Sequence, residues 1–509
     1  MLRKIKSFKG LFLSSLSAAL LILSFPRFNL EFLAWFGFVP VFFALRNKSL
    51  KQAFFLFFIT GIIFWSGIIY WLAHVTLAGT IVLVLYLALY FALFGLIIRP
   101  CTKHSTPYSL IFIPSVWVLL EYLRSHIFTG FPWALLGYSQ YLNLPFIQIA
   151  DITGVWGVSF LVMMVNVAIV EISWSLAKGL RPRLKAAVIL LVLFLSLTLS
   201  YGYFRLSAHP PKQTQHSMRV SVIQGNISQE LKWDPAARAY ILDRYAQLTE
   251  QAAADKPDLI IWPEASAPGL LGEDGAVFQE IFGLSKKAKT PLLVGAVSTN
   301  NDKYYNSVLL VEPPGAIVGR YDKIHLVPFG EYIPLKNVFS FLETIAPIGD
   351  IQRGTKFTIF ENQPRPGRAP ERFAVLICFE DLFPELSREF VKRGAGFLVN
   401  ITNDAWYKKT NAAHQHFQAC VFRAVENRVF LARSANTGVS GFINPYGKIV
   451  SLVSDDSGEN IFISGYNTQE IIPAAGASTF YTRYGDIFPL ACFLFALYGI
   501  IPFLKKRKP

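Results

Sequence analysis

Charged residues are scarce in this chain, and so are cysteines. Only 16% of its 509 residues are charged, against about 25% in an average soluble protein. The low polar content excludes an intrinsically disordered protein, and four cysteines in 509 residues exclude a disulfide scaffold. Hydrophobic residues make up 53% of the chain and include 45 phenylalanines, which is more apolar surface than one water-soluble core can hide.

The formal net charge of +15 is distributed unevenly along the chain. Residues 1–204 contribute +11 and residues 484–509 contribute +3, whereas residues 205–483 contribute only +1. A nucleic-acid-binding protein carries its basic residues on the folded domain that meets the phosphates. The distribution therefore predicts no nucleic-acid partner.

The two basic ends contain eight apolar stretches that are long enough, or nearly so, to cross about 30 Å of hydrocarbon. They lie near residues 10–26, 29–45, 53–74, 78–98, 108–124, 153–174, 186–204 and 484–504. Glu31 and Pro40 interrupt the second stretch, and Pro114 and Glu121 interrupt the fifth. Because Glu121 and Arg124 are three residues apart, we expect their side chains to pair near the membrane interface.

Basic residues in the short loops predict the orientation of these spans. With a cytoplasmic N-terminus, the inside segments hold 17 Lys and Arg residues and are 1–9, 46–52, 99–107, 175–185 and 505–509. The outside loops 75–77 and 125–152 hold none. By the positive-inside rule, both termini lie in the cytoplasm and residues 205–483 lie outside, in the periplasm of a bacterium with an outer membrane.

This pattern predicts three parts of the chain: a seven-helix transmembrane domain over 1–204, an external domain over 205–483, and an eighth helix with a basic tail over 484–509. In the external part, short apolar runs predict strands at 219–224, 258–263, 291–297, 307–312, 373–378, 396–401 and 439–443. Amphipathic stretches predict helices near 235–254, 275–288, 384–393 and 413–428. Apolar strands alternating with helices favour a layered α/β domain with a buried sheet.

Three polar segments at the ends of apolar runs are candidates for chemistry. Glu264 ends Trp-Pro-Glu, Lys323 lies within Tyr-Asp-Lys-Ile-His, and Cys378 begins Cys-Phe-Glu-Asp. Reactive groups of α/β folds commonly lie at the C-terminal ends of strands. A cysteine needs a base or a nearby cation to become a nucleophilic thiolate, and Glu264 and Lys323 could supply them.

Each of these residues also has a structural interpretation. Taken alone, Cys378 is a small buried apolar residue, Glu264 a solvated loop acid and Lys323 a surface charge. In an oxidising compartment Cys378 and Cys420 could instead form a disulfide. His414 and His416 are too few for a metal site without a third ligand, so a structural role is favoured for them.

In their order along the chain, Trp-Pro-Glu264, the segment from Lys323 to Glu331 and Cys378-Phe-Glu resemble the nitrilase superfamily, whose triad is Glu, Lys and Cys. The likeness covers about 219–466 and includes Asn-Ile-Thr-Asn-Asp-Ala-Trp at 400–406. A nitrilase domain between seven spans and an eighth is similar to the bacterial apolipoprotein N-acyltransferase family. This resemblance implies an αββα sandwich in the external domain.

The resemblance also implies a reaction. Cys378 attacks an acyl ester of a phospholipid and becomes a thioester. The α-amino group of a diacylglyceryl-modified N-terminal cysteine of an apolipoprotein then takes the acyl chain. Glu264 accepts the thiol proton, and Lys323 with the backbone N–H of Phe379 stabilises the oxyanion.

Further residues take supporting roles by the same resemblance. Glu331 corresponds to a second glutamate that positions Lys323, while Glu380 and Trp233 line the site. Phe379 stands where some members of the family have tyrosine, so no hydroxyl acts there. The family implies no cofactor and no metal, a bilayer environment in the bacterial inner membrane and a monomer.

Two alternative functions remain open from the sequence. A membrane-tethered amidase of the same fold would use the same triad, because the triad does not choose between water and an amine as acceptor. A transporter or sensor with an inactive external domain is the alternative from a different class. The intact set of Glu264, Lys323 and Cys378 and the small number of polar breaks in the spans argue against it.

Overall fold

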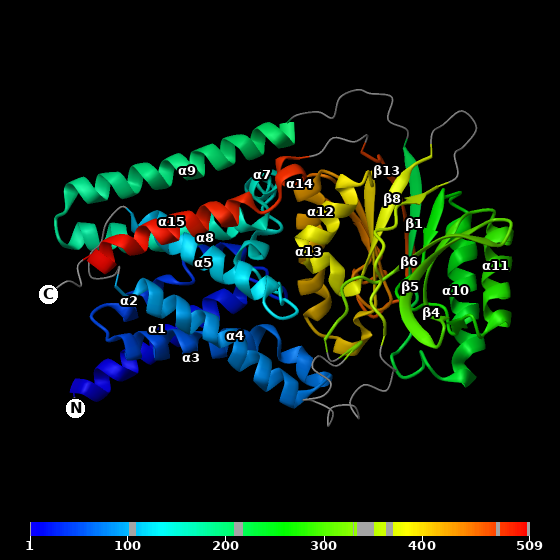
Figure 1. The fold of residues 1–509 in the computed structure, drawn as a ribbon, viewed down its shortest axis with the longest axis horizontal. Coiled ribbons are helices and arrows are strands. Elements are labelled where there is room, and N and C mark those ends of the chain that lie inside the picture. The colour runs from blue at the N-terminus through cyan, green and yellow to red at the C-terminus, as the bar shows by residue number, and fades with distance from the viewer. Residues whose placement is uncertain are drawn as a thin grey trace. The chain divides into compact units, whose positions relative to one another are not determined.

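The computed structural model describes residues 2–100, 108–207, 217–328, 330–332, 351–362, 370–474 and 479–505. The chain separates into two compact units, one formed by residues 1–209 and 484–509 and the other by residues 210–483 (Figure 1). The first unit is helical and the second is α/β. Most of the inside segment 99–107 and the last four residues of the basic tail lie outside the described residues.

The helical unit contains long apolar helices joined by short ones. Its longer helices are α1 (Leu2–Leu23), α3 (Leu50–Ile68), α4 (Leu77–Ile98), α5 (Ser109–His126), α8 (Val155–Ala177), α9 (Arg181–Ser207) and α15 (Ile487–Lys505). Short elements connect them: η1 (Glu31–Trp35), α2 (Val39–Leu45), η2 (Tyr70–His74), η4 (Leu136–Gln140), α6 (Leu144–Ile147) and α7 (Ala150–Thr153). Among the described residues, α3, α4, α8 and α9 are long and apolar enough to cross a membrane.

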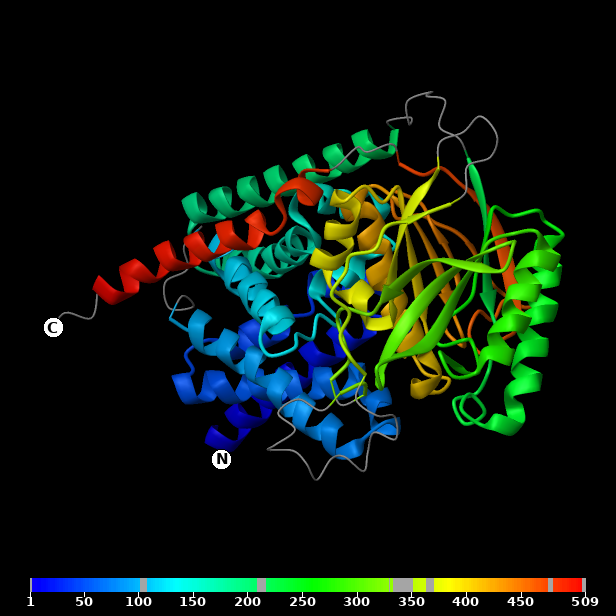
Figure 2. The same ribbon diagram turned by 45° about the vertical axis from the view of Figure 1, so that its right-hand side comes forward.

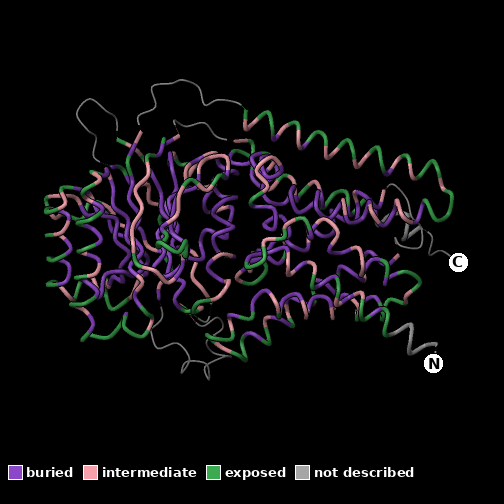
Figure 3. Tube along the Cα trace, turned by 180° about the vertical axis from the view of Figure 1, so that it is seen from behind, coloured by how far each residue is buried: buried purple, intermediate pink, exposed green. Residues whose placement is uncertain are grey.

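Apolar side chains on the outside of this unit indicate that its helices are surrounded by lipid. The helix α9 exposes Ile189, Leu197 and Phe204, and α15 exposes Leu490 and Leu494. Figure 3 shows α9 with exposed or intermediate positions along almost its whole length. Continuous apolar surface of this extent is unfavourable in water but not in hydrocarbon.

The second predicted span, 29–45, does not form one helix. It is divided into η1 and α2, with Pro40 in the first turn of α2, where its missing N–H breaks no helical hydrogen bond. Asn166 of α8 satisfies the interrupted backbone, because its side chain accepts from Phe38 N at 2.8 Å and donates to Ala34 O at 2.8 Å. Backbone groups cannot stay unpaired in lipid, so this asparagine makes the break tolerable.

Glu121 and Arg124, which were expected to pair, both bind the loop that follows α5. Arg124 Nη1 donates to Phe131 O at 2.6 Å and to Trp133 O at 2.8 Å. Glu121 Oε1 accepts from Leu136 N at 2.6 Å. Both charged side chains therefore hold the backbone of the loop that follows α5, whose carbonyl and N–H groups lack regular secondary-structure partners.

The α/β unit is built on two sheets. The first has the strand order β13-β1-β2-β4-β5-β6, with β3 paired to β4, and the second has the order β12-β11-β10-β9-β8-β7. The strands are β1 (Met218–Gln224), β2 (Leu259–Ile261), β3 (Leu270–Leu271), β4 (Leu292–Asn300), β5 (Lys303–Glu312), β6 (Ala316–Asp322), β7 (Phe360–Glu361), β8 (Arg372–Ile377), β9 (Phe397–Thr402), β10 (Phe430–Ala435), β11 (Gly441–Ile443), β12 (Ile449–Leu452) and β13 (Gly465–Ile471). Strands β1, β2 and β4 are parallel, as are β8, β9 and β10.

Helices cover the outer faces of both sheets. In Figures 1 and 2, α10 (Arg238–Ala253) and α11 (Gly275–Ala288) lie on the first sheet, and α12 (Pro384–Lys392) and α13 (Ala412–Asn427) lie on the second. The inner faces meet: Ser434 of β10 donates to Ile223 O at 2.7 Å and to Ile261 O at 3.2 Å across the two sheets. The predicted αββα sandwich is confirmed.

All seven predicted strands and four predicted helices overlap elements of this unit. The strands that the sequence did not indicate include β6 and β13, at the two ends of the first sheet. Their side chains are mostly exposed or half-buried. An edge strand of this kind lacks the apolar run by which a central strand is recognised.

Candidate active site

Glu264, Lys323 and Cys378 follow three different strands of the sandwich. Glu264 lies just after β2, Lys323 directly after β6 and Cys378 directly after β8. All three are buried, with 7%, 1% and 9% of their surfaces exposed. The structure brings together the residues that the motifs singled out, from both sheets of the sandwich.

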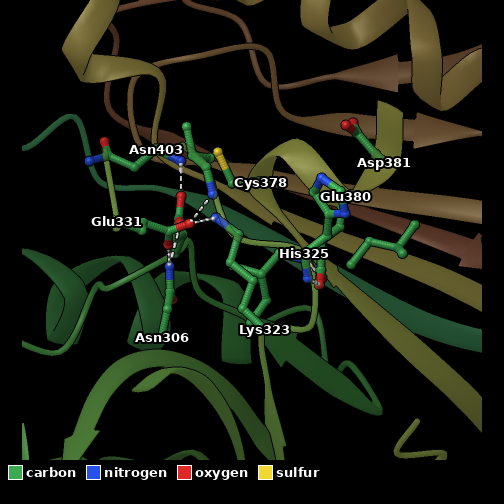
Figure 4. A network of polar contacts seen from close by, with 12 residues as sticks. Asn306, Lys323, His325, Glu331, Cys378, Glu380, Asp381 and Asn403 are labelled. Carbon is green, nitrogen blue, oxygen red and sulfur yellow. Dashed lines mark hydrogen bonds and ion pairs between the residues drawn. The ribbon is translucent and has the colours of Figure 1, made fainter. Parts of the chain in front are cut away.

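Two carboxylates surround the Lys323 ammonium group. Its Nζ lies 2.9 Å from Glu331 Oε2 and 3.7 Å from Glu264 Oε1. Asn306 Nδ2 donates to Glu264 Oε1 at 2.7 Å and to Glu331 Oε1 at 2.8 Å, so one amide bridges the two acids (Figure 4). The sequence analysis did not single out Asn306. Its place directly before the apolar run at 307–312 was the signal that could have pointed to a site residue there.

The second oxygen of Glu264 is held by the other sheet. Asn403, after β9, donates its backbone N–H to Glu264 Oε2 at 2.8 Å. The Asn403 side chain is fixed in turn, since it accepts from Asn436 at 2.9 Å and donates to Gln229 at 2.9 Å. Glu264 thus accepts hydrogen bonds at both oxygens, as an ionised carboxylate does. A carboxylate held in this way can act as a base.

Cys378 sits on a sharp turn between β8 and the 3-10 helix η7 (Cys378–Leu382). Its φ is +52°, a left-handed conformation that costs a non-glycine residue about 1 kcal/mol. Asn400 of β9 compensates by donating its side-chain amide to Cys378 O at 3.2 Å and to Leu376 O at 3.1 Å. The turn is therefore held by neighbours on an adjacent strand, as expected of a residue whose side chain must be presented.

Glu380 is fully buried and ties the Lys323 segment to the Cys378 segment. Its carboxylate accepts hydrogen bonds from Tyr321 Oη and from three backbone N–H groups, those of Ile324, His325 and Ile377. Burial raises the pKa of Glu380 to about 7, although the N–H groups of Ile377 and His325 oppose that rise. The residue was expected to line the site, and its hydrogen bonds join the segment that carries Lys323 to the segment that carries Cys378.

Trp233 and Phe379 differ in their placement. Trp233 is 40% exposed, whereas its neighbour Lys232 is 7% exposed and donates from Nζ to Glu264 O at 2.9 Å. Sequence reasoning named Trp233 and missed Lys232. Phe379 is buried, and its ring packs on those of His325 and Phe383.

Burial and neighbouring charges together set the pKa values of the Cys378 thiol and the Lys323 amine. Burial raises the pKa of the Cys378 thiol far above its usual range, Glu264 raises it further, and Lys323 lowers it. Burial lowers the pKa of Lys323, but Glu331, Glu264 and Cys378 outweigh it and the net pKa is raised. At neutral pH the resting site therefore contains a neutral thiol beside a lysine ammonium ion.

A buried charged network lies behind the nucleophile. His416 lies between two carboxylates, with Nε2 2.9 Å from Asp381 Oδ1 and Nδ1 2.9 Å from Asp404 Oδ1. Arg433 also joins both acids, at 2.7 Å and 3.3 Å. Cys420 Sγ donates to Asp381 Oδ2 at 3.0 Å, and Cys378 and Cys420 are free thiols. The disulfide alternative for these two cysteines is therefore wrong.

We expect His416 to make stability depend on pH. Burial lowers its pKa, but Asp381, Asp404 and their hydrogen bonds raise it to about 9, above about 6.5 for an unfolded histidine. The stabilisation is complete below about pH 6.5 and is lost as pH rises through about 9. The melting temperature of the full chain in detergent should therefore fall between these values by more in the wild type than in His416→Gln.

The adjacent histidine provides the control for this prediction. Burial lowers the pKa of His414, so its ionisation contributes no slope above pH 6.5. His414→Gln should keep the wild-type pH dependence. An equal fall in melting temperature in the wild type and in His416→Gln would contradict the assignment.

Comparisons with known proteins agree with this architecture. The family model described as carbon-nitrogen hydrolase matches residues 219–475, and that described as apolipoprotein N-acyltransferase N-terminal domain matches residues 17–168. The nitrilase-superfamily protein Nit3 of Saccharomyces cerevisiae is similar at 20% identity and a TM-score of 0.38, over 50% of this chain and 90% of its own. The family-model match to residues 219–475 places the chain in the carbon-nitrogen hydrolase family.

Relatives along the whole chain are more specific. An apolipoprotein N-acyltransferase of Geobacter metallireducens is 41% identical over 94% of this chain and 92% of its own length. One of Haemophilus influenzae is 30% identical over 97% of this chain and 95% of its own length. The chain belongs to the apolipoprotein N-acyltransferase family.

Proposed function

We propose that this protein transfers an acyl chain from a membrane phospholipid, through a thioester on Cys378, to the α-amino group of the N-terminal diacylglyceryl-cysteine of apolipoproteins. This is the last step of lipoprotein maturation. The observation that carries the proposal is the convergence of Glu264, Lys323 and Cys378 from three strand ends of the sandwich. Membership of the acyltransferase family and the apolar helices of the other unit support it.

In the first half of the reaction, Glu264 accepts the Cys378 proton as the sulfur attacks the ester carbonyl carbon of the phospholipid. The carbonyl oxygen becomes an oxyanion, which Lys323 and the backbone N–H of Phe379 stabilise. The intermediate collapses by breaking the bond to the glycerol oxygen. That oxygen takes the proton from Glu264, so a lysophospholipid leaves and an acyl thioester remains.

In the second half, the neutral α-amine of the acceptor attacks the thioester carbon. Glu264, now ionised again, accepts the amine proton while the oxyanion returns to the same donors. The C–S bond breaks, the sulfur takes the proton from Glu264, and an amide forms. The resting thiol is restored, and the two substrates use one site in turn.

The raised pKa of Cys378 fits this two-stage use of the base. Burial and the Glu264 charge keep the free thiol protonated, so a thiolate forms only as the proton moves to Glu264. A permanently ionised thiol would be more exposed to oxidation in the periplasm. The site is therefore suited to reacting only when an ester is in place.

The proposed placement is the bacterial inner membrane, with several spans, a periplasmic catalytic domain and both termini in the cytoplasm. The 17 basic residues of the inside segments support this orientation. Both proposed substrates are anchored in the outer leaflet, so the reaction requires the catalytic unit on that side. We propose that the enzyme acts as a monomer.

A membrane-tethered amidase would use the same three residues. The 41% identity to an acyltransferase over 94% of the chain favours the acyl-transfer function instead.

The test of the proposed function is the mass of the enzyme after incubation with phospholipid alone. We expect the full chain in detergent to gain one acyl group, located on the peptide that contains Cys378 and removed by hydroxylamine. Addition of a diacylglyceryl peptide with a free α-amine should discharge it and yield the N-acylated peptide, whereas an N-acetylated peptide should not. An unmodified Cys378 under these conditions would overturn the thioester mechanism.

A further inference from the structure

Lys232 is a second buried lysine beside Glu264, and its surroundings differ from those of Lys323. Lys323 lies between two carboxylates. Among the described residues, the Lys232 ammonium makes one hydrogen bond, to the main-chain oxygen of Glu264 at 2.9 Å, and no ion pair with a carboxylate. Burying an ammonium group with one neutral acceptor is unfavourable, because two of its three donors stay unpaired. Such a cost calls for a functional reason.

The local structure fixes the direction of the Lys232 side chain. Residues 229–233 form turns, in which Leu231 and Trp233 are exposed and Lys232 between them is buried. Gln229 anchors the start of this segment by accepting from the Asn403 side chain at 2.9 Å. Asp234 anchors its end by capping the following 3-10 helix through Ala236 N. Lys232 is thus held against the main chain of the proposed base.

The charge of Lys232 is coupled to both reacting groups. Burial lowers its pKa to about 8, and the charges of Glu264 and Cys378 oppose that fall. Glu264 at the end of β2 and Cys378 at the end of β8 are the titratable groups of the described residues that act on it. Lys232 is therefore mostly charged at pH 7 and loses its proton around pH 8.

We propose that Lys232 is a positioning residue whose ammonium group holds the main-chain carbonyl of Glu264 and so fixes the direction in which the base faces Cys378. A charged donor makes a stronger hydrogen bond to a carbonyl oxygen than a neutral amine does. Lys323 is shared with Glu331 and the oxyanion, whereas Lys232 binds the Glu264 carbonyl alone among the residues that the structure describes. This role rests on the proposed function, in which Glu264 is the base.

The test is the single-turnover rate of acyl-enzyme formation from phospholipid, measured between pH 6 and pH 9 in the full chain. Lys232→Met should be slower than the wild type by about tenfold at pH 6, since no ammonium group then holds the Glu264 carbonyl in place. The two rates should converge towards pH 9, because the wild-type lysine is then neutral. A residue with only a structural role would lower the rate by the same factor at every pH.

Two further variants complete the experiment. Lys232→Arg keeps a permanent charge and should restore the acid side of the profile. Lys287→Met removes an exposed lysine paired with Glu250 and should leave the whole profile unchanged. A constant ratio of wild type to Lys232→Met across the pH range overturns the inference. A wild type that forms no acyl-enzyme overturns the proposed function instead.

Discussion

Replacing Cys378 with alanine should abolish both acyl-enzyme formation and lipoprotein acylation, with a loss of at least about 10⁴-fold in rate. The reason is that the thioester forms on the Cys378 sulfur, while Glu264 and Lys323 are engaged with each other and with Asn306 and Glu331. The folded state should persist, because alanine removes only a thiol from a turn held by its main chain. The measurements are intact mass after incubation with phospholipid and the yield of N-acylated peptide.

Cys420→Ala is the matched control for this experiment. Cys420 is also a buried free thiol of the same unit, but it donates to Asp381 in the network behind the site. The variant should still gain one acyl group, although the lost hydrogen bond lowers its stability by about 1 kcal/mol. An acyl adduct in Cys378→Ala would contradict the assignment of Cys378 as the nucleophile. Loss of the adduct in a folded Cys420→Ala would contradict it as well.

Replacing Lys323 with methionine should cause the second large loss. Removal of the oxyanion donor lowers the acylation rate by about 10²- to 10³-fold. It also leaves Glu264 and Glu331 without their buried cation, and breaking a buried pair in this way costs about 3–5 kcal/mol. The measurements are the single-turnover acylation rate and the melting temperature of the full chain in detergent.

A double variant separates these two effects. Lys323→Met combined with Glu331→Gln removes one of the two stranded charges, so its melting temperature should rise above that of Lys323→Met alone. Its acylation rate should stay low, because the donor to the oxyanion is still missing. Acylation at the wild-type rate in either variant would refute the role assigned to Lys323.

The sequence indicated most of the buried strands of the sandwich, but it missed β10, which is buried at five of its six positions and whose apolar run is interrupted by Arg433 and Ser434. The strand β9 is buried along its whole length and was visible as an apolar run. The edge strand β13 was not indicated, because the run of four polar residues at 467–470 resembles a loop. The same limit applies in the helical unit, where residues 29–45 are apolar enough for a span but are divided at Pro40, a break that only Asn166 of α8 makes tolerable.

In the candidate site, too, the sequence indicates residues that lie in local motifs but not the partners that contact them from distant parts of the chain. Glu264, Lys323 and Cys378 lie in motifs that can be recognised one by one. Their partners cannot: Asn306 contacts Glu264 from 42 residues away and Asn403 from 139 residues away. A hydrogen bond between such positions leaves no periodicity in the chain.

By itself, the sequence determined the class of the protein, because the motifs that identify it are local. It also predicts the side of the membrane on which the chemistry occurs, because hydropathy and loop charge are sums over local residues. Only the tertiary structure decided which polar groups meet. It buried Lys232 and exposed Trp233, used Glu380 to tie two site segments together, and kept Cys378 and Cys420 as separate thiols. These outcomes depend on the packing of two sheets, and the direction of a side chain in a turn is set by the partners that the packing brings within reach.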